Sequence, residues 1–224
     1  MEIELTPVFR EAFPEGIFGV LIVQDCSNRA RALAIGPAQR VVETRLRERF
    51  PDDTIDSDPV ALAYAVYFRR YGARYPVVHQ ARTIIVGRAI DSPFALVEVM
   101  FTAEVDSLVL TSGHDLDALA GPLRVDVARA GDAYAKLSGK EQALKPGDMV
   151  VRDAEGIIAC VLYGPDFRTR LRPETHAALF GAWCPAGLSA EIAEAHLTTL
   201  AGLLRLEWPE AIVAGPRIWR AVDK

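Results

Sequence analysis

A chain of 224 residues, half of them hydrophobic, is long enough to bury a core and does not have the composition of a disordered protein. Its formal net charge of −5 argues against a protein that binds nucleic acid mainly through an overall positive charge, because that affinity needs many Lys and Arg residues to neutralise phosphates. The three cysteines lie far apart with no histidine at ligand spacing, so the sequence predicts buried free thiols, no disulfide framework and no metal site.

The N-terminal stretch is acidic and lacks the basic start and apolar core of a signal peptide. The longest apolar run near it, residues 16–23, is too short to span a bilayer. The sequence therefore predicts a cytoplasmic protein that has no membrane partner, and no cofactor is predicted.

The first half of the chain reads as one strand followed by helices. The continuous apolar run at residues 17–23 predicts a buried strand. Each stretch after it begins with proline and continues with apolar residues at helical spacing. Asp58 stands before the second stretch and is a good N-cap. The predicted helices cover residues 37–50, 59–72, 76–88 and 93–105.

From residue 107 the chain changes to short apolar runs separated by Gly, Pro and Asp, which is typical of strands and turns. A long helix over residues 188–206, capped by Ser189, and a short apolar run at 210–219 follow these strands. The predicted strands cover residues 107–111, 123–129, 149–153, 157–163 and 176–183.

These elements predict a mixed α/β (α+β) fold, in which mainly antiparallel sheet layers pack against helices. A polar loop at residues 51–58 divides the chain into an N-terminal extension, 1–58, and a main domain, 59–224. The alternative is that both parts form one domain.

Four segments in the order and spacing found here resemble one known module. They are residues 67–88, 103–134, 144–169 and 172–183. Between about Tyr67 and Leu204 the chain is similar to the editing module formed by the third and fourth B domains of the bacterial phenylalanyl-tRNA synthetase beta subunit. The catalytic core of a synthetase is not recognisable in the sequence, so we do not expect this chain to charge tRNA.

The resemblance implies hydrolysis of the ester that joins a wrong amino acid to tRNA. A synthetic pocket built from apolar groups cannot strongly reject an isostere that adds a hydroxyl, so a second pocket must discard it. An aminoacyl ester is already activated, so such a site needs a positioned water, donors for the developing oxyanion and a group that transfers protons. No covalent nucleophile is required.

Carried over residue by residue, the resemblance assigns roles along two loops. Ser112 occupies the position of a histidine that approaches the ester in the family, and His114 follows two residues later; these two are the catalytic candidates. Asp166 corresponds to a family glutamate that reads a substrate hydroxyl, although its side chain is one methylene shorter. The substrate-binding candidates are Asp166, Gly113, Gly164 and Thr175.

Three arginines, Arg168, Arg170 and Arg172, alternate just after Asp166. In an extended segment they would project to one side and could contact RNA phosphates. The alternative is a solvated strand edge protected by charge.

The other candidates also have structural alternatives. An exposed turn would leave His114 solvated, and a serine near a histidine in sequence is a nucleophile only if the base reaches it in space. His196 lies on the apolar side of the last predicted helix and is expected in the core. Asp115 could cap a short helical turn as well as take part in chemistry.

Two functions remain open. In one, the chain is an aminoacyl-tRNA deacylase that acts in trans on the aminoacylated acceptor end. In the other, it is a non-catalytic module that binds tRNA or a small amino-acid-like ligand. The sequence does not define its oligomeric state.

Overall fold

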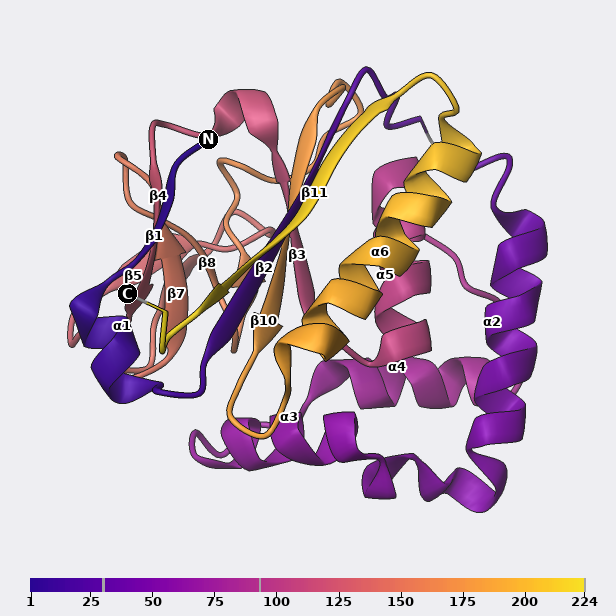
Figure 1. Ribbon diagram of the computed structural model, residues 1–224, viewed down its shortest axis with the longest axis horizontal. Coiled ribbons are helices and arrows are strands. Elements are labelled where there is room, and N and C mark those ends of the chain that lie inside the picture. The colour runs from indigo at the N-terminus through magenta and orange to yellow at the C-terminus, as the bar shows by residue number, and fades with distance from the viewer. Residues whose placement is uncertain (30, 93, 224) are drawn as a thin grey trace.

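The computed structural model describes residues 1–29, 31–92 and 94–223. Within these ranges the chain forms six α-helices and two main β-sheets, which is the mixed α/β class that the sequence predicts. In Figure 1 the two sheets lie side by side, and α5 and α6 cover the four-stranded sheet on the side away from the five-stranded sheet.

The four-stranded sheet has an antiparallel arrangement throughout. Its interior strand β2 corresponds to the predicted strand 17–23, and its unbroken apolar sequence fits a strand that is covered on both faces. The strand order is β11 (Ile212–Arg220), β2 (Ile17–Gln24), β10 (Ala178–Cys184) and β3 (Thr111–Asp115).

The five-stranded sheet contains one parallel pair, β1 with β4, and is otherwise antiparallel. Its order is β1 (Ile3–Leu5), β4 (Leu123–Val127), β7 (Met149–Arg152), β8 (Ile157–Cys160) and β9 (Gly164–Pro165), and a separate hairpin pairs β5 (Ala133–Ala135) with β6 (Glu141–Ala143). The sequence did not predict β1, β5, β6 or β9, because strands of two or three residues are too short to show an alternating pattern.

The predicted helices are present with shifted ends, and one short helix near the N-terminus was not predicted. Asp58 caps α3 as expected, since its carboxylate accepts hydrogen bonds from the N–H groups of Val60 and Ala61. The helices are α1 (Pro7–Ala12), α2 (Gly36–Arg49), α3 (Pro59–Arg69), α4 (Pro76–Ile85), α5 (Ala95–Ser107) and α6 (Ala190–Glu207), with 3₁₀ turns η1 (Pro51–Ser57) and η2 (Leu116–Ala118). Pro93, the predicted start of the fourth helix, lies outside the described residues.

The predicted strand at residues 107–111 is wrong. Ser107 is the last residue of α5, and Leu108 ends that helix in the left-handed conformation with φ of 59°. The strand begins only at Thr111 and continues to Asp115. This shift places the polar residues 112–115 inside a sheet.

The larger of two hydrophobic clusters extends from Ile3 to Ala221 and includes residues of both sheets, and a smaller one lies around Tyr134 and Val150. The free thiols of Cys26, Cys160 and Cys184 are buried, as predicted. The division at residue 58 stays a prediction. No helix within the described ranges is long and apolar enough to cross a membrane.

Candidate functional site

The segment that carries Ser112 and His114 is a buried strand at the edge of the four-stranded sheet. Every residue of β3 is buried, so the expectation of an exposed turn around His114 is wrong. On one side β3 pairs with β10, where Ser112 lies opposite Gly181. The Cα of Gly113 faces the other side of β3, toward α5. A Cβ at this position would lie 3.3 Å from the Met100 sulfur.

The second predicted segment lies along the free edge of β3. His114 forms an isolated bridge with Arg170, and the N–H of Asp115 donates to the carbonyl of Thr169 at 2.7 Å. The segment that follows β9 in the five-stranded sheet therefore contacts the edge strand of the other sheet. Residues more than fifty positions apart meet at this junction.

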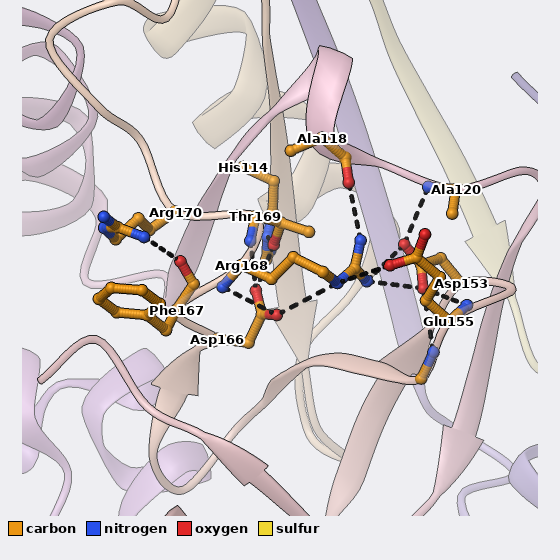
Figure 2. Close-up of polar contacts among 11 residues, drawn as sticks. His114, Ala118, Ala120, Asp153, Glu155, Asp166, Phe167, Arg168, Thr169 and Arg170 are labelled. Carbon is orange, nitrogen blue, oxygen red and sulfur yellow. Dashed lines mark hydrogen bonds and ion pairs between the residues drawn. The ribbon is translucent and has the colours of Figure 1, made fainter. Parts of the chain in front are cut away.

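A chain of hydrogen bonds connects Ser112 to Asp166. The Ser112 hydroxyl lies 3.1 Å from Nε2 of His114, and Nδ1 of His114 lies 2.7 Å from the hydroxyl of Thr169. The Thr169 hydroxyl donates to Oδ1 of Asp166. All four side chains are buried, and Figure 2 shows His114, Thr169 and Asp166 in line.

The proton positions in this chain of hydrogen bonds follow from the Asp166 carboxylate at its end. Thr169 has one hydroxyl proton and donates it to Asp166, so its oxygen must accept from Nδ1–H of His114. Nε2 of His114 then carries the lone pair and accepts the proton of the Ser112 hydroxyl. The arrangement orients a serine hydroxyl toward an unprotonated imidazole nitrogen, which is the geometry of an activated hydroxyl group.

Burial lowers the pKa of His114 to about 4, because the charged imidazolium loses its hydration inside the protein. His114 is therefore neutral near pH 7, as the hydrogen-bond chain requires.

The space between Ser112 and Asp166 is filled by the side chains of His114 and Thr169. Ser112 is 4% exposed and His114 is 1% exposed. Nε1 of Trp183 also donates to the Ser112 hydroxyl at 3.3 Å. Two surface hollows, of about 460 and 750 Å³, are lined by other parts of the chain.

Asp166 has an internal structural role. Besides the Thr169 hydroxyl, it accepts from the N–H groups of Thr169 at 2.9 Å and Arg168 at 3.3 Å. An aspartate suits these short-range contacts, because its carboxylate can reach N–H groups two and three residues ahead.

Two of the three predicted RNA-binding arginines pair with buried carboxylates. Nη2 of Arg168 donates to both carboxylate oxygens of Asp153, at 2.7 and 2.8 Å, and Nη1 donates to the carbonyl of Ala118 (Figure 2). Arg172 donates to Asp115 at 2.9 Å. Arg170 instead lies over the ring of Phe167, 3.6 Å from its centroid.

Thr175 and Asp115 are buried and form a second cluster with the partly exposed Arg172. The Thr175 hydroxyl donates to Asp115 at 2.8 Å and accepts from the N–H of Arg172 at 2.9 Å. Burial opposes ionisation of Asp115, but the hydrogen bonds from Arg172 and Thr175 outweigh it and hold its pKa below the usual value. Asp115 also caps η2, because it accepts from the N–H of Asp117.

Gly164 adopts φ of +79°, and its carbonyl accepts a hydrogen bond from the Tyr134 hydroxyl. This backbone conformation lies in the left-handed region, which favours glycine, at the point where the chain leads from β8 to Asp166.

Sequence reasoning missed Thr169 and Asp153. The alternation that placed the three arginines on one side of an extended segment puts Thr169 on the opposite, inward side, so this signal was present. Asp153 had no such signal, because it is the last residue of a predicted strand and its partner Arg168 is fifteen residues away.

His196 lies in the core, as predicted. Its two ring nitrogens are each 2.7 Å from a hydroxyl, those of Ser107 and Thr111. Across residues 1–29, 31–92 and 94–223, no three His, Cys, Asp or Glu side chains gather as a metal site.

No protein-family model matches the chain. Over 67 residues, or 30% of this chain, it is 34% identical to the phenylalanine–tRNA ligase beta subunit of Mycoplasma genitalium, and the match covers 8% of that subunit. The chain therefore resembles this subunit while spanning only a small share of its length.

A crystal structure of an N-terminal fragment of the phenylalanyl-tRNA synthetase beta subunit from Pyrococcus horikoshii matches 95% of this chain and 50% of that fragment. The identity is 12% and the TM-score is 0.49, which is too low to support an argument about function.

Proposed function

We propose that this chain binds the aminoacylated acceptor end of tRNA and hydrolyses the ester of a mischarged amino acid in trans. The observation that carries the proposal is the chain of hydrogen bonds that runs from Ser112 through His114 and Thr169 to Asp166. The resemblance to the phenylalanyl-tRNA synthetase beta subunit supports the choice of tRNA as the ligand.

The proposed chemistry uses water as the nucleophile. The water oxygen bonds to the ester carbonyl carbon and gives a proton to the Ser112 oxygen, while the Ser112 hydroxyl proton moves to Nε2 of His114. The carbon–oxygen bond to the ribose then breaks, and the ribose oxygen takes a proton back along the same route. The products are a free amino acid and a tRNA with a free terminal hydroxyl.

Access to Ser112 requires a movement at the junction of the two sheets, because the described side chains fill it. Burial is the largest cause of the low pKa of His114. Opening the junction to water would therefore raise this pKa toward 6.5 and make His114 a better base near neutral pH.

A second candidate is a non-catalytic module that binds tRNA or a small amino-acid-like ligand. The observation that favours it is the closure of the junction, where the four side chains satisfy one another and Arg168 and Arg172 are engaged by Asp153 and Asp115. In this case the hydrogen-bond chain only joins the two sheets.

A panel of mischarged aminoacyl-tRNAs distinguishes the two candidates. The wild type should release the amino acid from at least one of them faster than buffer does, and Ser112→Ala and His114→Gln should abolish the excess. If every ester decays at the buffer rate while tRNA still binds, the non-catalytic function is correct.

A further inference from the structure

The segment from Pro59 to Ile90 has a charge balance unlike the rest of this acidic chain. It contains five arginines and neither aspartate nor glutamate, whereas the whole chain has a formal charge of −5. The segment forms α3 and α4, which lie in the lower part of the molecule in Figure 1. Positive charge is thus concentrated on this helical pair.

A groove of about 750 Å³ runs along these helices. Small and apolar side chains contribute to its lining, among them Ala61, Leu62, Ala65 and Val78. Arg69, Arg74 and His79 line it as well. A groove with apolar surface and guanidinium groups offers contacts both for flat rings and for anions.

The guanidinium groups of Arg69 and Arg74 are available for a ligand. Both residues are exposed, and neither side chain forms an ion pair or a hydrogen bond with any described residue. Arg82, at the same groove, instead pairs with Asp53 and Asp56. The acidic side of the groove is therefore already neutralised, and Arg69 and Arg74 leave it with net positive charge.

The beginning of α4 adds to this field. Tyr75 and Pro76 line the groove, and the helix starts there without a side-chain cap. The N–H groups of a first helical turn and the helix dipole both favour an anion at this position.

We propose that the groove between α3 and α4 binds the phosphate backbone of the RNA, with Arg69 and Arg74 as the phosphate contacts. The inference rests on the proposed function, which requires an RNA ligand. It replaces Arg168 and Arg172 as the main contacts, because those arginines are engaged by buried carboxylates. Within the described residues, no acidic side chain neutralises Arg69 or Arg74.

The test measures binding of uncharged tRNA to the full chain by fluorescence anisotropy over a range of salt concentrations. The double variant Arg69→Ala, Arg74→Ala should bind about tenfold more weakly at low salt, and its slope of log K against log salt should be smaller by about 2. A matched control removes two other exposed arginines, Arg205 on α6 and Arg217 on β11, and should bind like the wild type.

Three results would overturn the inference. If the double variant keeps the wild-type affinity and salt slope, RNA binds elsewhere and the proposed function is unaffected. If an acidic peptide such as polyglutamate binds the groove and tRNA does not, the ligand is a protein. If the wild type binds no tRNA at all, both the groove assignment and the proposed function are wrong.

Discussion

Thr169 decides which nitrogen of His114 carries the proton. Its hydroxyl donates to Asp166 and therefore accepts from Nδ1–H of His114. In this way the Asp166 carboxylate fixes the tautomer of His114 without contacting it. A residue without a hydroxyl at this position would leave Nδ1 of His114 without a partner and would remove one of the hydrogen bonds to Asp166.

Replacing Thr169 by Val should destabilise the protein by about 1–3 kcal/mol, since the buried Nδ1–H of His114 loses its acceptor and the buried carboxylate of Asp166 loses one of its hydrogen bonds. Thr169→Ser keeps the hydroxyl and should lose much less. Urea unfolding of both variants measures the difference. Equal stability of the Val variant and the wild type would mean that the hydrogen-bond chain is not formed in solution.

At the scale of elements, the helices were predictable because capping residues and the helical periodicity of apolar residues are local signals. β3 was not predictable, because its five residues, Thr111 to Asp115, are small or polar although the strand is buried. The apolar run just before it, residues 108–110, resembles a strand but follows the end of α5. Because the buried side chains of β3 are small or polar and several form hydrogen bonds, the sequence of this strand shows no hydrophobic pattern.

The candidate site was predictable in part for a related reason. The residue types and the resemblance brought together Ser112, His114 and Asp166, which the structure joins through Thr169. Their burial and the internal pairing of Arg168 and Arg172 depend on contacts between two sheets. Such long-range contacts are not encoded in any short stretch of sequence.

Replacing each of two glycines that have open space around them by alanine should change the stability of the protein in opposite directions. Gly164 has φ of +79°, so Gly164→Ala should cost about 1 kcal/mol through backbone strain alone. Gly202 lies inside α6, and a Cβ added there would meet no atom of the described residues within 4 Å, so Gly202→Ala should stabilise the helix by up to about 1 kcal/mol. Thermal unfolding measures both, and a stabilised Gly164 variant would contradict the assigned turn.

At the scale of the whole molecule, a second buried polar group joins α5 to β3 away from the candidate site. The Glu104 carboxyl accepts from the N–H of Thr111 at 2.8 Å, and burial raises its pKa to about 8. The folded protein therefore keeps a proton on Glu104 that the unfolded chain releases above about pH 4.5.

The stability of the wild type should consequently fall relative to Glu104→Gln as pH rises from about 4.5 to about 8. The expected slope is about 1.4 kcal/mol per pH unit, because one proton separates the folded and unfolded states. The amide does not ionise, so the variant serves as the reference, and His114 and His196 cancel because both proteins contain them. Urea titrations across this range that give parallel pH profiles would rule out a protonated Glu104.

The most direct test of the central claim is the rate at which the purified protein hydrolyses its best mischarged aminoacyl-tRNA near neutral pH. The wild type should exceed His114→Gln and Ser112→Ala by about a hundredfold or more, since each variant removes the proton route. Folding of the variants is checked by circular dichroism. Equal rates for the wild type, both folded variants and buffer would show that the Ser112–His114 pair is not a hydrolytic centre.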